Sequence, residues 1–158
     1  MYSQHFAYNP TGQLISAYMA GDSTNFIYPS TDSKNPSSMS LSLSGLSLTS
    51  TFEYDNAPNP LLITYKVPAL FFCFYPSLST TLPSYTTYSG YVPTLFSSNN
   101  ITKITTTMPL RSNFVVVQDI TYTYGTKGYP VTAVQKVSVN GVDQGTTNTF
   151  SYQYNNCQ

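Results

Sequence analysis

The chain has few charged residues, one histidine, one glutamate and no tryptophan. Only 8% of its 158 residues are charged, against about 25% in an average soluble domain. Six basic residues balance six acidic ones, so the formal net charge is zero and no net field attracts a nucleic acid or an anionic membrane. Its polar surface must come from hydroxyl and amide side chains, which is common in secreted β proteins.

Long apolar runs are also missing. The longest apolar stretch covers residues 67–75 and contains Pro68, so it is too short to cross a bilayer. Met1 is followed by neither a basic region nor an apolar core. We therefore expect no signal peptide in this sequence, and any native leader to have been removed.

Cysteine is scarce as well, with only Cys73 and Cys157 present. Cys73 lies in the apolar run, where it is expected to be a small buried hydrophobic residue. The two are too far apart in the chain for a short metal-binding spacing. We expect two free thiols rather than a disulfide.

What the chain has in abundance is tyrosine and phenylalanine, arranged in a recurring phrase. An aromatic pair two residues apart is followed by turn residues and then by an apolar strand. The copies span residues 6–14, 52–61 and 122–131, and a half-copy spans residues 150–156. Aromatic residues two apart share one face of a strand, and the Asn, Asp, Pro and Gly cluster reverses the chain. Each copy is therefore a β-hairpin, with Tyr8, Tyr54 and Tyr124 in equivalent places at a strand end.

These hairpins predict an all-β fold, an antiparallel meander in a single domain covering residues 1–158. Prolines interrupt residues 55–98, which are expected to be an irregular insertion. Residues 41–48 alternate apolar and hydroxyl side chains, which predicts one half-buried strand with a bulge at Gly45. The Asn140-Gly141 pair predicts a two-residue hairpin turn. Almost no helix is expected.

Several of these phrases together resemble a known family. They are Phe52-Glu53-Tyr54-Asp55-Asn56 with Asn59-Pro60, Asn99-Asn100-Ile101-Thr102-Lys103-Ile104, Tyr122-Thr123-Tyr124 with Gly128-Tyr129-Pro130, and Tyr152-Gln153-Tyr154. Across roughly residues 5–156, they resemble the uncharacterised β-rich surface lipoproteins of Bacteroidetes, which carry degenerate tyrosine-aspartate, RHS-like repeats. The resemblance implies a sheet of consecutive hairpins and a lipid anchor at the bacterial outer surface, and it brings no catalytic residues. This chain departs from the family because neither cysteine is placed to serve as the lipobox anchor.

Residues that could do chemistry are few. His5 has no neighbouring nucleophile, and it is expected to be exposed at a frayed terminus. Glu53 and Asp55 are two residues apart, and a glycosidase needs two carboxylates at a defined separation. However, Asp55 begins a turn and is expected to cap its own backbone, whereas Glu53 alternates with aromatic residues and is expected to face solvent. No catalytic residue, metal site or cofactor is predicted.

The best binding candidates are three tyrosines with small polar neighbours, Tyr85, Tyr88 and Tyr91. Such side chains can stack on sugars or contact proteins, but they can equally lie over the sheet and cover its apolar face, which is the reading we favour. The prediction is a non-enzymatic, extracellular or cell-surface β protein with a structural or binding role. Two alternatives stay open: a carbohydrate-binding accessory module of a surface glycan system, and a hydrolase.

The apolar run also bears on partners. Leu70, Phe72 and Phe74 share one strand face and Phe71, Cys73 and Tyr75 share the other, so residues 70–75 are expected to be buried on both sides. A single-layer sheet normally covers only one of these faces. The residues that bury the other face come either from the proline-rich middle of the chain or from another chain. Self-association and glycan binding are therefore the two kinds of partnership considered, with no nucleic acid and no membrane-spanning segment.

Overall fold

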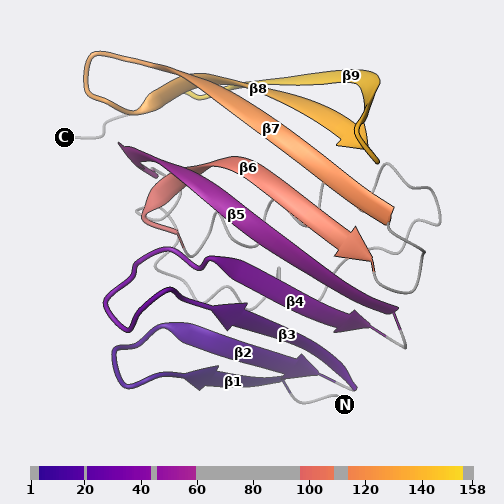
Figure 1. Cartoon of the computed structure of the whole chain (residues 1–158). Helices are drawn as coiled ribbons and strands as arrows, with labels where there is room; N and C mark the ends of the chain where they lie inside the picture. Colours follow the sequence, from indigo (N-terminus) through magenta and orange to yellow (C-terminus); the bar gives the residue numbers. More distant parts are fainter. Residues whose placement is uncertain (1–3, 20, 44–45, 60–96, 109–113, 155–158) are drawn as a thin grey trace.

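The chain folds into one antiparallel β-sheet. We describe residues 4–19, 21–43, 46–59, 97–108 and 114–154 of a computed structural model. They form nine strands, which are β1 (Gln4–Tyr8), β2 (Leu14–Met19), β3 (Asp22–Ile27), β4 (Ser38–Leu43), β5 (Leu46–Pro58), β6 (Asn99–Met108), β7 (Phe114–Tyr124), β8 (Pro130–Val139) and β9 (Val142–Ser151). Each strand pairs with the next in sequence order (Figure 1). The predicted all-β meander of hairpins is confirmed.

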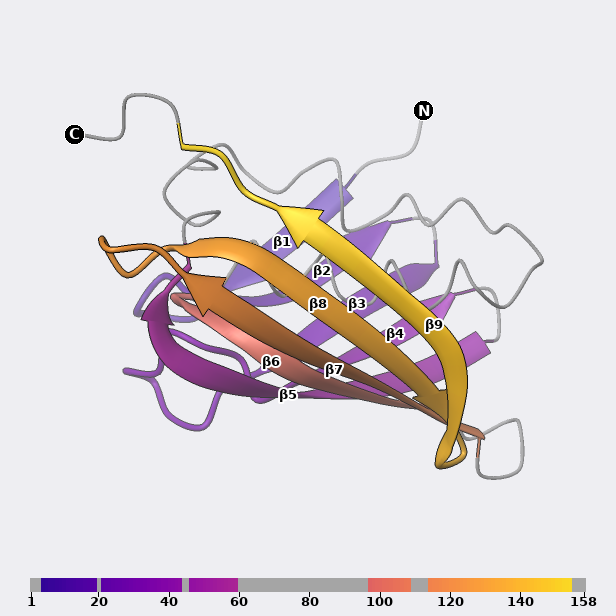
Figure 2. The ribbon, with the colours of Figure 1, turned by 90° about the horizontal axis from the view of Figure 1, so that it is seen from above.

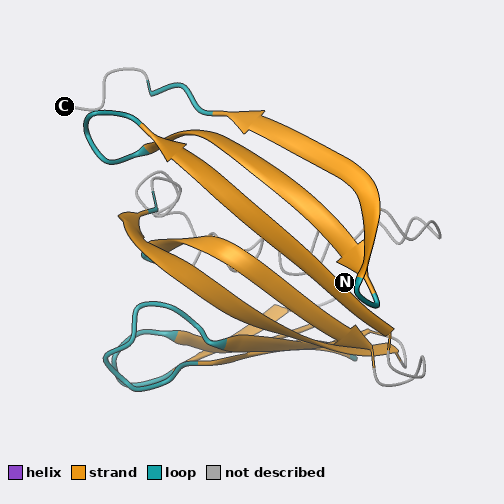
Figure 3. Cartoon of the chain, turned by 45° about the horizontal axis from the view of Figure 1, so that its top comes forward, coloured by secondary structure: helices purple, strands orange, loops and turns teal. Residues whose placement is uncertain are grey.

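The sheet twists strongly from one edge to the other. Figure 2 shows the strands β1 to β4 running at a marked angle to β6 to β9, as the right-handed twist of successive strands requires. Within the described ranges every residue belongs to a strand or a loop (Figure 3). None of these residues forms a helix that could cross a membrane.

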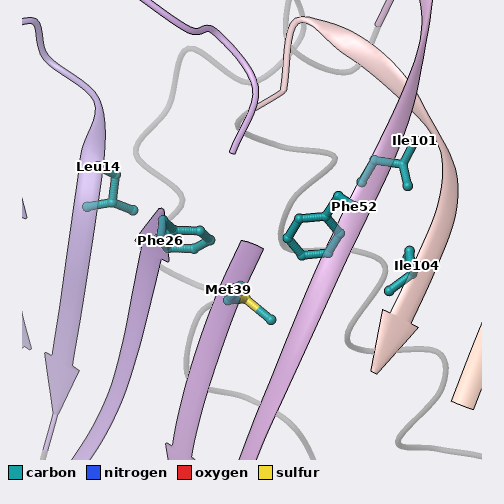
Figure 4. Packing of buried hydrophobic residues seen from close by; sticks show 6 residues of the cluster. All are labelled: Leu14, Phe26, Met39, Phe52, Ile101 and Ile104. Atoms are coloured by element: carbon teal, nitrogen blue, oxygen red, sulfur yellow. The ribbon is translucent and has the colours of Figure 1, made fainter. Parts of the chain in front are cut away.

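One face of the sheet holds the hydrophobic core. Apolar side chains on successive strands pack side by side there, from β2 to β6 (Figure 4). The buried members are Leu14, Phe26, Met39, Phe52, Ile101 and Ile104. Phe6, Tyr28, Tyr54 and Ile120 pack against them. This face also buries polar groups in pairs: the Ser50 and Thr106 hydroxyls lie 2.8 Å apart, and Gln135 Nε2 donates to Gln118 Oε1 at 2.6 Å.

The alternation in residues 41–48 belongs to two strands rather than one. Leu43 of β4 lies opposite Leu46 of β5, so residues 44 and 45 join two antiparallel strands. The prediction of a single strand bulged at Gly45 was therefore wrong. The spacing of the leucines indicates the turn, because Leu41 and Leu43 have odd residue numbers whereas Leu46 and Leu48 have even ones. A two-residue connection reverses that parity, whereas a continuous strand keeps it.

Two other predictions concern the ends of strands. At the Asn140-Gly141 turn both residues have positive φ, 49° and 79°, which confirms the predicted hairpin turn. The insertion was expected to begin near residue 55, but β5 continues to Pro58 and pairs it with Asn99. Cys73, Cys157, Tyr85, Tyr88, Tyr91 and the run 70–75 lie outside the described residues.

Candidate functional site

The three copies of the repeat share a bulge at the same place. In each hairpin the ladder shifts by one residue immediately before the tyrosine, so that one residue of the following strand has no partner. The pairs after the shift are Tyr8 with Leu14, Tyr54 with Ile101, and Tyr124 with Pro130. The bulge explains why buried residues are three apart in these strands, as in Ile101 and Ile104. The predicted equivalence of the three tyrosines is confirmed in register, although the strand of Tyr54 does not end there.

The tight turns of the first and last copies are the same turn. Asn9 N donates to Gln13 O at 3.0 Å, and Gly12 N donates to Asn9 O at 2.9 Å. In the last copy Gly125 N donates to Tyr129 O at 2.9 Å, and Gly128 N donates to Gly125 O at 3.0 Å. Gly12 and Gly128 have φ of 82° and 78°, a conformation that glycine adopts without strain.

The middle copy closes differently, through Asp55. Its Oδ1 accepts from Ala57 N at 3.0 Å and from Asn100 N at 3.2 Å. The first bond caps the local backbone, as predicted for this residue. The second reaches across to the residue that precedes Ile101 in β6. Asp55 therefore joins the two sides of a hairpin whose strands, ending at Pro58 and beginning at Asn99, are separated by 40 residues of chain.

The other carboxylate oxygen of Asp55 has its own partners. Asn100, which is only 4% exposed, donates from Nδ2 to Oδ2 at 3.2 Å. The Tyr124 hydroxyl donates to the same oxygen. Burial, followed by the hydrogen bond and charge of Asp55, raises the pKa of Tyr124 above its usual value. Tyr124 thus holds its proton and ties the β7 end to the β5 end.

An amide network extends from this point. Asn35 Oδ1 accepts from Ser98 N at 2.8 Å, and Asn35 Nδ2 donates to Asn99 Oδ1 at 2.9 Å. Asn59 Nδ2 donates to Ser97 O at 2.9 Å, and both of these residues are buried. Amides suit this position because each one donates and accepts at once. The network connects the loop before β4 with the start of β6.

Tyrosine hydroxyls fasten neighbouring hairpins to one another by a shared geometry. Each one donates to a backbone carbonyl on the preceding strand or the residues leading into it. The bonds run from Tyr54 to Pro36 O at 2.7 Å, from Tyr122 to Ile101 O at 3.0 Å, and from Tyr154 to Pro130 O at 2.6 Å. Burial raises the pKa of both Tyr54 and Tyr122. We call these three bonds the tyrosine clasps.

The sheet face opposite the core is covered with hydroxyl groups, and we call it the hydroxyl face. One row crosses it from Asn25 through Ser40 and Thr49 to Thr107. The exposed or half-buried serines and threonines on this face include Ser16, Ser23, Ser38, Ser40, Ser42, Ser47, Thr49, Thr51, Thr105, Thr107, Thr121, Thr123, Thr132, Ser138, Thr147, Thr149 and Ser151. This face offers many weak donors and acceptors and little charge.

A single charged row interrupts the hydroxyl face. Glu53, Lys103, Asp119 and Lys136 stand opposite one another on β5 to β8, with alternating sign. Lys103 Nζ lies 3.9 Å from Glu53 Oε1 and 3.9 Å from Asp119 Oδ1. These pairs are exposed, so each contributes little to stability. Glu53 faces solvent as predicted.

The two carboxylates considered for hydrolysis, Glu53 and Asp55, therefore have different partners and different structural roles. Glu53 pairs with Lys103 on the solvent face, whereas Asp55 turns toward Asn100 and Tyr124 after the bulge. His5 is exposed as predicted, but it lies within β1 rather than at a frayed end, with its ring centroid 6.4 Å from that of Tyr18. Among the described residues no cluster of His, Cys, Asp and Glu side chains could hold a metal ion.

Sequence reasoning found Asp55 but missed its partner. Asn100 was named only as part of the phrase Asn99–Ile104 that carries the family resemblance, because nothing local links residues 45 apart. The ladder register places Asn100 where the first copy has Gln13, and only the folded sheet shows this equivalence. The amide pair between Asn35 and Asn99 has no such signal in the sequence.

Comparison with known proteins supports the fold. No protein-family model matches the chain, and no curated protein is similar in sequence. The structure is similar to the crystal structure of a porin-like protein from Bacteroides uniformis, with a TM-score of 0.55 and 15% identity. The match covers 96% of this chain and 59% of that one, so this chain spans under two thirds of the neighbour.

Proposed function

We propose that this chain is a non-enzymatic β protein of the bacterial outer surface, with a structural or binding role carried by the hydroxyl face. The proposal rests on one observation: Asp55 and the repeat tyrosines form structural hydrogen bonds within the sheet. Asp55 and the tyrosine clasps hold the hairpins together through bonds to backbone and amide groups. A carboxylate that accepts from Asn100 and Tyr124 has lone pairs engaged, which makes it a poor general base.

The surface placement is supported by two features. The charged fraction of 8% is low, and the hydroxyl face provides polarity without charge. The structural neighbour is a porin-like protein of a Bacteroides species, which agrees with the bacterial group suggested by the repeat phrases. Surface proteolysis of intact cells that express the native gene tests the placement. Protection of the protein in intact cells, with cleavage only after lysis, would contradict it.

Enzymatic activity is tested by a screen of glycosides and esters with the purified chain. We expect no turnover above that of Asp55→Asn and Glu53→Gln. The two variants form a matched pair, because one changes the hairpin closure and the other changes the solvent face. A rate that either substitution abolishes in a folded protein would overturn the non-enzymatic assignment.

Carbohydrate binding is the second candidate, and one side chain favours it. Tyr18 is 47% exposed on the hydroxyl face, opposite Ser23 in the ladder and beside the ring of His5. A tyrosine ring next to hydroxyl groups can stack on a sugar ring. Titration with oligosaccharides, comparing the wild type with Tyr18→Ala and with the more distant Thr121→Ala, tests this role. Binding that both variants keep would place the sugar elsewhere.

A further inference from the structure

Strand β9 forms one edge of the sheet, and no described strand pairs with its outer side. It is the last strand in the sheet order, and β8 is its only neighbour among the described strands. All ten residues from Val142 to Ser151 are exposed, and Val142 and Phe150 are 64% and 37% exposed. Figure 2 shows β9 along the outer margin of the sheet.

The register decides which backbone groups of β9 point outward. Tyr152 N donates to Val131 O at 3.0 Å, so this pair is one of the hydrogen-bonded pairs of the β8–β9 ladder. Such pairs alternate along an antiparallel ladder, so Asn148 and Phe150 also bond toward β8. The N–H and C=O groups of Thr147, Thr149 and Ser151 therefore point away from β8.

This edge has little protection against pairing. Edge strands of natural sheets usually carry lysine, proline, inward-pointing charges or bulges. Residues 144–154 contain no charged residue and no proline. The ladder irregularity lies between Asp143 and Thr147, so Thr147 to Ser151 stay in register with β8.

The charged row ends on β8 and does not continue onto β9. Its signs alternate from Glu53 to Lys136, and the position on β9 opposite Lys136 is the neutral Thr147. A neutral residue at this position leaves the outer edge without the charge that usually blocks pairing with another strand.

We propose that the outer edge of β9 pairs with β9 of a second copy of this chain, antiparallel, about a two-fold axis at Thr149. A copy turned by 180° about an axis perpendicular to the sheet runs its β9 antiparallel to the first. That operation also keeps the buried faces on the same side, so both hydroxyl faces form one continuous surface. Thr149 then faces Thr149 of the copy, and Thr147 faces its Ser151.

The outward backbone groups match this arrangement. The pairs formed by Thr147, Thr149 and Ser151 are of the hydrogen-bonded type, and each such pair exchanges two backbone bonds. On the core face, Phe150 of one copy comes to stand opposite Asn148 of the other. The exposed ring of Phe150 is covered in this way.

The alternative edge pairing is less favourable. Strands β1 and β9 run parallel in the sheet, because both are odd-numbered members of a meander. Stacking copies by translation would therefore pair β9 with β1 in parallel, and repetition would give an open filament. Parallel pairing is weaker per residue, and β1 has only five residues.

The test combines association with residue-level exchange in the full chain. Thr149→Pro removes an outward N–H but no bond to β8, and edge strands tolerate proline in this orientation. Thr149→Val keeps the N–H and is the matched control. We expect a concentration-dependent dimer by sedimentation velocity, weakened at least tenfold in Thr149→Pro and largely unchanged in Thr149→Val. A dimer unaffected by Thr149→Pro would overturn the proposal.

Amide exchange in the wild-type chain provides an independent reading that does not depend on a variant folding. We expect the amides of Thr147, Thr149 and Ser151 to become protected as the concentration rises, while those of Asn148 and Phe150 are protected throughout. A chain that stays monomeric at about 1 mM, a filament, or outward amides protected in the monomer would each overturn the proposal.

Discussion

Asp55 and Asn9 make the same pair of hydrogen bonds in two different hairpins. Asn9 Oδ1 accepts from Thr11 N at 3.1 Å and from Gln13 N at 2.9 Å. Asp55 Oδ1 accepts from the corresponding amides, the one two residues on and the one just before the ladder partner of the repeat tyrosine. The same side-chain oxygen thus closes a four-residue turn in one copy and a long connection in the other.

Replacing Asp55 separates its hairpin role from its charge. Asp55→Ala leaves the buried Asn100 amide without this acceptor, and we expect it to destabilise the fold by about 1–3 kcal/mol. Asp55→Asn keeps an amide oxygen like that of Asn9, so the expected loss is below about 1 kcal/mol. Urea unfolding measures both losses. Glu53→Ala is the control, expected within about 0.5 kcal/mol of the wild type; equal losses for all three variants would refute the closure role.

The hairpin framework could be predicted from the sequence because it rests on local chemistry. Tyr8 and Tyr124 precede turns whose glycines require positive φ, and these signals lie within a few residues of one another. The bond between Asp55 and Asn100 could not be predicted, since their separation of 45 residues leaves no local trace. The three binding candidates at Tyr85, Tyr88 and Tyr91 remain untested, because they lie outside the described residues.

The turn glycines offer a test in which backbone conformation is the only variable. A Cβ at Gly12 or Gly128 would meet no atom within 4 Å, so alanine there costs only the left-handed conformation. We expect Gly12→Ala and Gly128→Ala to destabilise by about 1–2 kcal/mol each, and by similar amounts because the turns are equivalent. Thermal unfolding measures the change. Asparagine tolerates this conformation better, so Gly→Asn variants as damaging as the alanine variants would contradict the explanation.

A buried hydroxyl pair on the core face can be examined by a double-mutant cycle. Ser50 and Thr106 are almost fully buried and bond to each other at 2.8 Å. Ser50→Ala or Thr106→Val alone leaves one hydroxyl unsatisfied, with an expected loss of about 1–3 kcal/mol. The double variant should lose less than the sum, with a coupling of at least about 0.5 kcal/mol. The neighbouring solvent-face pair Thr51 and Thr105 is the control, and equal coupling in both pairs would argue against the bond.

The core face was predicted in outline but not in its polar content. The spacing of aromatic residues predicted that Phe52 and Tyr54 share one strand face, and Tyr54 packs against the core cluster that contains Phe52. The same spacing gave no reason to expect Gln118 and Gln135 to be buried together, because glutamine is usually exposed. Their mutual hydrogen bond offsets the cost of burial, and it depends on a register that only the folded sheet provides.

The tyrosine clasps should make the stability of the protein depend on alkaline pH. Burial, and then the neighbouring Tyr152, Asp55 and Tyr124, raise the pKa of Tyr122 above its ordinary value of 10.0. The folded state therefore holds this proton more tightly than the unfolded state does. The resulting stability is fully present below pH 10 and is lost as the pH rises from there toward the higher folded pKa.

Tyr122→Phe removes both the clasp and its titration. At pH 7 we expect the variant to be less stable than the wild type by about 0.5–1.5 kcal/mol, the value of one hydrogen bond. Between pH 9 and pH 11 the wild type should lose stability more steeply, because only its unfolded state releases the Tyr122 proton, so the gap between the two proteins should narrow. Urea unfolding at pH 7, 9 and 11 measures this gap, with the exposed Tyr18→Phe as the control. A gap that widens with pH would show that Tyr122 does not hold its proton in the fold.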